Sequence, residues 1–303
     1  MPRARLVHDL GYALSLHYGP TELVRYVYQP TDAQVESPRP YFHPMRTLAG
    51  DLVSLYRPHD HVWHKGLAWS LPNVGAENFW GGPIYLREGG YQQRSNNGAM
   101  RHDGFDRVEL HDGQVTVEER LTWVTEAGEA WFAEARSMRI AVEPDAGAWV
   151  LLFGTHLVNQ SGHDVVFGSP TTQGRPNAGY GGLFWRGPRS FTGGSVHTPA
   201  GAGGDELMGV REPWLAFSGR HDDHGRQSTV VMVDAATNAG HPTKWFVRST
   251  PFACFCPAPF FDTEVTLAPG AELALRYAVV VADGGPDGVQ RWAKLGTEAL
   301  AVW

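Results

Sequence analysis

Alternation of apolar and polar residues is most regular in the middle of the chain. Residues 113–125, 131–143 and 148–159 form three long segments with this pattern, and Glu126-Ala127-Gly128 separates the first two. A period of two is typical of β-strands, whose successive side chains point to opposite faces. Three such segments in succession predict an antiparallel meander. Gly154, inside the third segment, predicts a bulge or a bend.

Glycine and proline separate shorter extended segments on both sides of this meander. Residues 13–28 predict two strands around Gly19-Pro20, and residues 264–282 predict a hairpin that turns at Pro269-Gly270. A flexible loop is expected at residues 195–205, one helix at residues 288–300, and further short strands at residues 52–56, 105–110, 214–218, 229–234, 245–248 and 252–261. These elements predict an all-β protein: a large antiparallel β-sandwich or barrel with a short C-terminal helix, in a single domain of residues 1–303.

Composition narrows the classes of partner. The formal net charge is −7 at pH 7 and no run of Lys or Arg occurs, which argues against binding to nucleic acid or an anionic membrane. No window holds 18 uninterrupted apolar residues, and charged residues interrupt the first twenty positions, so neither a membrane span nor a secretory signal is predicted. A cytoplasmic protein is expected. Cys254 and Cys256 are expected to be small buried apolar side chains, because they lie too close for a disulfide framework.

The densest chemistry lies in residues 57–80, RPHDHVWHKGLAWSLPNVGAENFW. If the chain is extended there, His59 and His61 share one face, and His64 joins them only if the chain turns at Val62-Trp63. Three neutral imidazoles would suit a divalent metal such as Zn, Fe or Mn, whereas Lys65 beside them would repel a cation. A hydrogen-bonded histidine network is the alternative to a metal site.

The same histidines are candidates for acid/base chemistry without a metal. Histidine titrates nearest neutrality, so His59, His61 or His64 could work with the carboxyl of Glu77 or with His102 as a general acid/base pair. The alternative places His102 in a surface turn before the strand at residues 105–110. No G-x-S-x-G elbow, P-loop or dinucleotide fingerprint occurs, so a nucleotide cofactor is not expected.

Aromatic residues beside polar ones suggest sugar binding. Tryptophan and tyrosine rings flanked by Arg, Asn and Gln commonly hold sugar rings, although tryptophans in a β-sandwich also form the core. The candidate substrate-binding residues are Arg46, Trp63, Lys65, Trp69, Asn78, Trp80, Arg101, Arg175, Asn177 and Tyr180.

The histidine segment also resembles the family labelled PmoA-like or DUF6807, whose members carry an HxHxxH-[RK]-G-L segment followed by N/D-F-W. Here the first element is His59 to Leu67 and the second is Asn78-Phe79-Trp80. The resemblance continues through an H-x-x-F element within residues 100–105 and GRPNAGYGG at residues 174–182. The length, the long antiparallel run and the closing Pro-Gly hairpin are similar to galactose-mutarotase-like supersandwiches. That similarity implies a β-supersandwich that acts on or binds carbohydrates in a shallow cleft, using histidine and carboxylate residues.

We therefore expect a carbohydrate-active enzyme that uses the histidine cluster for acid/base chemistry on a sugar or glycoside. The expected catalytic residues are His59, His61, His64, His102 and Glu77. Lyase, hydrolase and epimerase reactions all need such groups. Two alternatives stay open: a non-catalytic carbohydrate-binding protein, and a metal-dependent oxygenase or hydrolase with the first three histidines as ligands.

Overall fold

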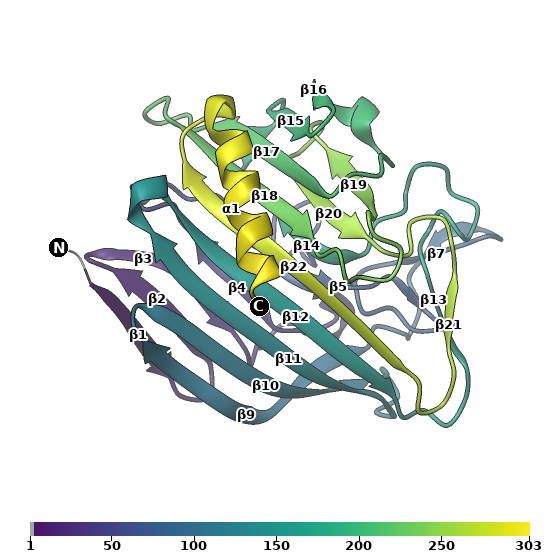
Figure 1. Ribbon diagram of the computed structural model, residues 1–303. Coiled ribbons are helices and arrows are strands. Elements are labelled where there is room, and N and C mark those ends of the chain that lie inside the picture. The colour runs from purple at the N-terminus through teal and green to yellow at the C-terminus, as the bar shows by residue number, and fades with distance from the viewer. Residues whose placement is uncertain (1–2) are drawn as a thin grey trace.

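The computed structural model describes residues 3–303, in which two antiparallel β-sheets pack face to face (Figure 1). The first sheet has eight strands in the order β1-β2-β3-β4-β5-β14-β20-β19. Their bounds are β1 (Ala4–Asp9), β2 (Ala13–Tyr18), β3 (Thr21–Val27), β4 (Tyr41–Met45), β5 (Leu67–Ser70), β14 (Gly182–Arg186), β20 (Cys254–Ala258) and β19 (Lys244–Arg248).

The second sheet has nine strands within the described residues, in the order β16-β15-β17-β18-β22-β12-β11-β10-β9. Their bounds are β16 (Gly201–Gly203), β15 (Ser195–Thr198), β17 (Trp214–Arg220), β18 (Gln227–Asp234), β22 (Glu272–Asp283), β12 (Ala148–Asn159), β11 (Ala130–Glu143), β10 (Gln114–Val124) and β9 (Ala99–His111). Two smaller sheets are β21 (Val265–Leu267) with β13 (Val165–Gly168) and β6 (Asn73–Val74), and β7 (Ile84–Leu86) with β8 (Gly90–Gln92).

The predicted meander is confirmed as β10, β11 and β12, which pair in succession. In β10 the side chains of Val115, Val117, Leu121 and Trp123 lie in the core between the sheets. This alternation explains why the sequence pattern located these strands correctly. The all-β sandwich is confirmed as well. No helix among residues 3–303 is long and apolar enough to cross a membrane.

The predicted C-terminal helix is confirmed as α1 (Val289–Ala301). Figure 1 shows it lying across the outer face of the second sheet, over β22. Val289, Trp292, Ala293 and Gly296 form its buried side. The other helical turns are 3-10 helices: η1 (Gln34–Glu36), η2 (Pro144–Ala146), η3 (Arg189–Phe191), η4 (Asp205–Leu207) and η5 (Pro286–Gly288).

The prediction of a bulge at Gly154 is wrong. Gly154 pairs in regular register with Ser137. A Cβ at this position would lie 2.9 Å from an indole carbon of Trp303 and 2.7 Å from the Ser137 hydroxyl. Glycine is therefore present because the C-terminal tryptophan packs against the strand, which is the close approach that a missing side chain allows.

Three other local predictions are wrong. Residues 195–205 are not a loop, because β15 and β16 pair there as a hairpin at the edge of the second sheet. Residues 52–56 form single bridges instead of a strand. The chain does turn at Pro269-Gly270, but β21 pairs with β13 while β22 pairs with β12 and β18. The apolar run of β22 is buried at the centre of the large sheet, which takes it away from β21.

Candidate functional site

The outer face of the first sheet carries a second set of large side chains. In β14, Leu183 and Trp185 point into the core, so Phe184 and Arg186 point outward. The same alternation in β19 sends Phe246 and Arg248 to the outer face. Both strands are therefore covered on two sides, by the core and by a separate aromatic cluster outside it.

Strand register aligns two arginines across this outer face. Arg186 and Arg248 both pair with Cys254 of β20, one from each side. The side chain of Arg186 is fully buried, and its guanidinium lies 3.6 Å from the ring centre of Phe252. Burial raises the pKa of the Cys254 thiol to about 12, so the thiol stays protonated at neutral pH. Both cysteines are free and buried, which confirms their predicted packing role.

The histidine segment folds over this face as two consecutive turns. The His61 amide donates to the Pro58 carbonyl (3.0 Å), and the His64 amide donates to the His61 carbonyl (2.9 Å). The chain therefore turns at Val62-Trp63, which is the condition under which His64 was expected to join the cluster. The extended alternative, with His59 and His61 on one face, is wrong. His59 lies exposed, with its Nδ1 3.5 Å from Arg189.

His61 and His64 form a stacked pair. Their ring centres lie 4.7 Å apart with an angle of 17° between the planes. The Nη1 of Arg186 donates to the Nδ1 of His64 (3.3 Å). Because arginine can only donate, this contact requires that Nδ1 carry no proton and that the neutral ring hold its proton on Nε2.

Burial sets the charge of both rings. Desolvation lowers the pKa of His64 well below its usual range, and the neighbouring His61 and Arg186 lower it further. Burial also lowers the pKa of His61, against the opposing effect of Asp60, whose carboxylate lies 3.5 Å from its Nδ1. Among the described residues, neither Nε2 atom has a protein partner and neither is sealed from solvent. Two neutral imidazoles therefore present Nε2 to the space above the sheet.

Further aromatic walls come from loops on either side. The side-chain oxygen of Asn78 accepts from the amides of Trp80 (2.9 Å) and Gly81 (3.1 Å), which fixes the turn that delivers the Trp80 ring. A Cβ on Gly82 would lie 2.7 Å from the Trp63 ring, so the tryptophan packs directly on backbone there. Trp80 in turn contacts Tyr180, with ring centres 4.6 Å apart.

Together these groups line a cavity of about 550 Å³ that is open to solvent on one side, within the range of small-molecule sites. Its lining combines two histidines, two arginines and seven aromatic rings: His61, Trp63, His64, Trp80, Pro83, Tyr91, Arg175, Tyr180, Phe184, Phe246, Arg248, Pro251, Phe252 and Cys254. Two other hollows among residues 3–303, one between β1 and the turn that joins β9 to β10 and one beside α1, contain no histidine. The histidine-lined cavity is therefore the candidate site.

Six of the residues predicted from sequence line this cavity: His61, Trp63, His64, Trp80, Arg175 and Tyr180. The other nine lie elsewhere. Trp69 is in the core, Asn78 shapes the Trp80 turn, Asn177 occupies an exposed turn with φ +50°, Arg46 lies 3.6 Å from Glu22, and Arg101 is exposed beside Asp103. His59 is exposed and does not line the cavity either.

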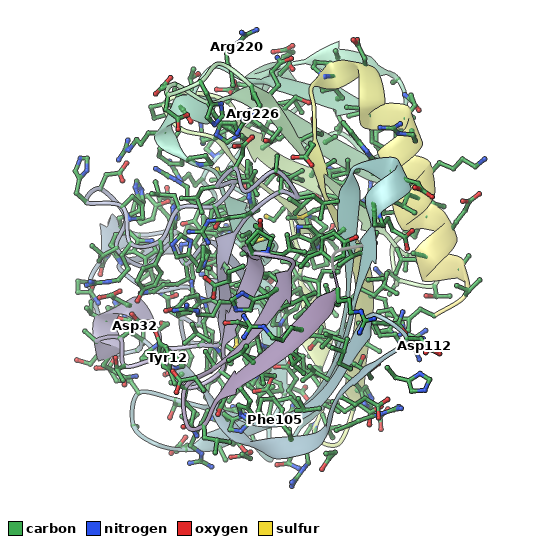
Figure 2. All side chains as sticks on the ribbon, turned by 90° about the vertical axis from the view of Figure 1, so that its left-hand side faces the viewer. Tyr12, Asp32, Phe105, Asp112, Arg220 and Arg226 are labelled. Carbon is green, nitrogen blue, oxygen red and sulfur yellow. The ribbon has the colours of Figure 1, made fainter. Side chains whose placement is uncertain are left out.

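The remaining three predicted residues have partners away from the cavity. Lys65 is buried in ion pairs with Asp32 (2.9 Å) and Glu36, which anchor the base of the histidine turn. Figure 2 shows Asp32 on the side of the molecule away from α1. His102 lies between the sheets, with Nδ1 2.7 Å from Glu119. Burial raises the pKa of Glu77, which accepts from the Glu126 amide (3.1 Å).

A three-histidine metal site does not form among the described residues. His59 lies exposed beside Arg189, and no group of three His, Cys, Asp or Glu side chains converges within residues 3–303. Because Arg186 already donates to the Nδ1 of His64, that nitrogen is not free to bind a cation.

Eight lining residues escaped the sequence analysis: Pro83, Tyr91, Phe184, Phe246, Arg248, Pro251, Phe252 and Cys254. A signal was present in Leu183-Phe184-Trp185-Arg186 and Trp245-Phe246-Val247-Arg248. A strand with apolar residues at successive positions must be covered on both faces. An arginine that ends each such run indicates that the outer cover is partly polar.

The fold and the site thus define an all-β sandwich with an aromatic, histidine-bearing cavity on one outer face. Residues 13–294 match the model of the family described as "Family of unknown function (DUF6807)", so the chain belongs to that family. That description does not include the name PmoA-like. A search of curated proteins finds no match.

Solved structures with a similar chain path include a galactose 1-epimerase from Lactobacillus acidophilus, at 7% identity and a TM-score of 0.41, covering 94% of this chain and 100% of that one. Another is an α-galactosidase from Lactobacillus brevis, at 10% identity and a TM-score of 0.40, covering 95% of this chain. This chain spans only 40% of the α-galactosidase. At these scores the activities of those proteins do not transfer to this chain.

Proposed function

We propose that this protein is a carbohydrate-active enzyme in which His61 transfers a proton at a sugar carbon or oxygen while His64 donates a hydrogen bond to a sugar oxygen. The observation that carries the proposal is a stacked pair of neutral histidines opening on an aromatic-walled cavity. Flat aromatic rings suit the apolar faces of a sugar, while the imidazole nitrogens and arginines suit its hydroxyl groups.

The two histidines would take different roles. The contact from Arg186 fixes the proton of His64 on Nε2, so the neutral His64 ring donates a hydrogen bond that stabilises a substrate oxygen as negative charge develops on it. His61 has no such contact from a cation. Its Nδ1 makes no hydrogen bond, but the negative charge of the Asp60 carboxylate 3.5 Å away favours a proton on that nitrogen. Its Nε2 is then a free acceptor, and His61 serves as the general base.

The lining narrows the reaction class. Most glycosidases use two carboxyl groups across the scissile bond, and no Asp or Glu among residues 3–303 lines this cavity. Proton abstraction and return, as in an epimerase or lyase, needs only an acid and a base. The chemistry therefore favours these two reaction types over hydrolysis by paired carboxylates.

The same absence of lining carboxylates supports one second candidate, a non-catalytic carbohydrate-binding protein. It uses the same cavity and the same aromatic walls. The binding protein and the enzyme differ in one expected result. In a binding protein, substitution of either histidine would weaken sugar binding, and the wild type would show no turnover.

Substitution of each histidine tests the proposal. With turnover assayed on a panel of oxidised and unoxidised sugars and glycosides, we expect His61→Gln and His64→Gln each to lower kcat roughly 10²- to 10⁴-fold, with binding largely kept. His111→Gln, an exposed histidine outside the cavity, is the matched control. Normal kcat in both cavity variants would refute the proposal. Sugar binding with no turnover on any substrate would favour the binding protein.

A third variant separates acid/base chemistry from metal chemistry. His59→Gln leaves the stacked pair intact, so we expect kcat within about two-fold of the wild type, a change of less than about 0.5 kcal/mol in the barrier. A metal bound by all three histidines would instead make this variant as inactive as the other two. Elemental analysis of the wild-type protein gives an independent readout.

A further inference from the structure

The charge of the cavity lining is opposite to that of the whole chain. The protein has a formal net charge of −7, yet the lining contains Arg175 and Arg248 and no Asp or Glu. The fully buried Arg186 lies immediately behind the histidines and adds a third cation. A recessed, partly apolar space strengthens the field of such charges relative to a flat surface, because less water screens them.

Among residues 3–303, no carboxylate lies within ion-pair distance of Arg248. Three other cations of this region do have such a partner: Arg186 and Arg189 pair with Asp60, and Lys244 pairs with Asp262. Arg186, its counterpart across Cys254, faces Asp60 at 3.6 Å. Asp205 belongs to η4, which contacts β19, and its carboxylate accepts from the amides of Ser249 and Thr250 and from the Thr250 hydroxyl. The half-buried guanidinium of Arg248 is therefore left with its charge uncompensated inside the cavity.

Arg175 approaches the same cavity from the opposite loop. It donates to the Tyr91 hydroxyl, which lies 3.0 Å from the hydroxyl of Tyr180. The Tyr180 ring then contacts Phe246, the residue that shares its face of β19 with Arg248. Aromatic residues thus connect the two arginines around the rim, and Arg175 also makes no ion pair with the described carboxylates.

We infer that the ligand of this cavity is a sugar that carries an anionic group, a carboxylate or a phosphate, bound by Arg248 and Arg175. The inference rests on the proposed function and adds the charge of its substrate. Arginine presents a planar set of donors that matches both kinds of oxyanion, and a charged acceptor strengthens each hydrogen bond. An anionic ligand would supply the partner that the protein itself does not.

Matched ligands test the inference on the intact protein. The probes are methyl glycosides of glucose and galactose, the corresponding uronates and the corresponding 6-phosphates, titrated by calorimetry at low and at high salt. We expect one anionic series to bind at least about ten-fold more tightly than its neutral parent, since a hydrogen bond to a charged group outweighs a neutral one. The preference should shrink at high salt. Whichever anionic series binds more tightly identifies the oxyanion.

A pair of variants locates the effect. Arg248→Gln should remove the preference for the anionic probe, about a ten- to hundred-fold loss of affinity, while the neutral glycoside binds as before. Arg107→Gln changes the net charge equally, at an exposed residue of β9 paired with Glu109, and should leave the preference unchanged. Equal losses in both variants would reduce the effect to overall charge and overturn the inference.

The remaining outcomes separate this inference from the proposed function. Equal binding of neutral and anionic sugars would overturn the anionic ligand and leave a carbohydrate site. Binding of inorganic phosphate as tight as that of the sugar phosphates, with no neutral glycoside bound, would overturn both, because the sugar ring would then contribute nothing. Binding of no probe at all would count against the proposed function itself.

Discussion

Both large sheets carry apolar side chains on their outer faces, but the two faces are covered differently. On the second sheet these side chains are mostly small, as in Val233, Ala278 and Val280, and α1 lies directly on them. On the first sheet they are large rings and arginines, and the cover consists of turns and loops. The histidine cavity lies under the turns and loops that cover the first sheet.

Side-chain size explains the difference. A Cβ on Gly296 of α1 would lie 2.9 Å from a methyl of Val233 and 3.1 Å from a methyl of Val280, so helix and sheet approach closely. Rigid rings such as Phe184 and Phe246 hold loops away from the strands, and these loops supply the two histidines and Arg175. A helix that packs on small residues thus stabilises the fold, whereas loops that pack on rings leave room for a ligand.

The largest expected effect is on the helix-covered face. Trp292 is 1% exposed, and its indole N–H donates to the Ala146 carbonyl (2.9 Å). We expect Trp292→Ala to lower the free energy of unfolding by about 3–5 kcal/mol, as for other large-to-alanine changes in a core. Denaturant unfolding measures this, and sugar affinity of the folded fraction serves as the control. A loss below about 1 kcal/mol would mean that α1 contributes little to the sandwich.

The next effect depends on pH and belongs to the loop-covered face. Burial lowers the pKa of His64 in the folded protein, whereas the unfolded chain titrates near 6.5. Below that pH the unfolded state binds a proton that the folded state does not, so the free energy of unfolding falls as the pH falls. The stabilisation is complete above about pH 6.5, and about 2 kcal/mol is lost by pH 5.

His64→Gln isolates this contribution from those of the other histidines. We expect the variant to lose about 2 kcal/mol less stability than the wild type between pH 7.5 and pH 5, measured by denaturant unfolding at each pH. Parallel pH profiles for the two proteins would contradict a neutral, buried His64. The helix-covered face provides the contrast, because its buried cluster contains no titratable side chain.

The sequence located elements whose pattern is local and regular. Alternation placed the meander of β10 to β12, and turn residues placed the hairpin of β2 and β3. The partner of β21 could not be predicted, because the turn at Pro269-Gly270 leads into a strand that the central sheet buries on both faces. Pairing over long sequence distances depends on packing that no local pattern contains.

The site was predicted only in part, because some of its residues lie in one short segment and others come from distant strands. The cluster around His61 and His64 was visible as a concentration of residue types within one short segment. Assignment of His59 to that cluster assumed a strand, whereas local hydrogen bonds at Pro58 form a turn. Phe246 and Arg248 come from β19, far away in sequence, and only the sheet order β14-β20-β19 brings them to the histidines.

The smallest expected effect makes the comparison direct, because it repeats the tryptophan substitution on the other face. Trp63 is only partly buried, and it packs on Gly82 and beside His61 above the cavity. We expect Trp63→Ala to cost about 1 kcal/mol of unfolding free energy, typical of a partly buried site, and to weaken sugar binding by up to about ten-fold through loss of one stacking ring. Trp292→Ala should show the reverse balance, with a large loss of stability and unchanged affinity. If the two variants lost stability equally, the loops over the first sheet would be as much a part of the core as α1, and the distinction between a stabilising cover and a binding cover would fail.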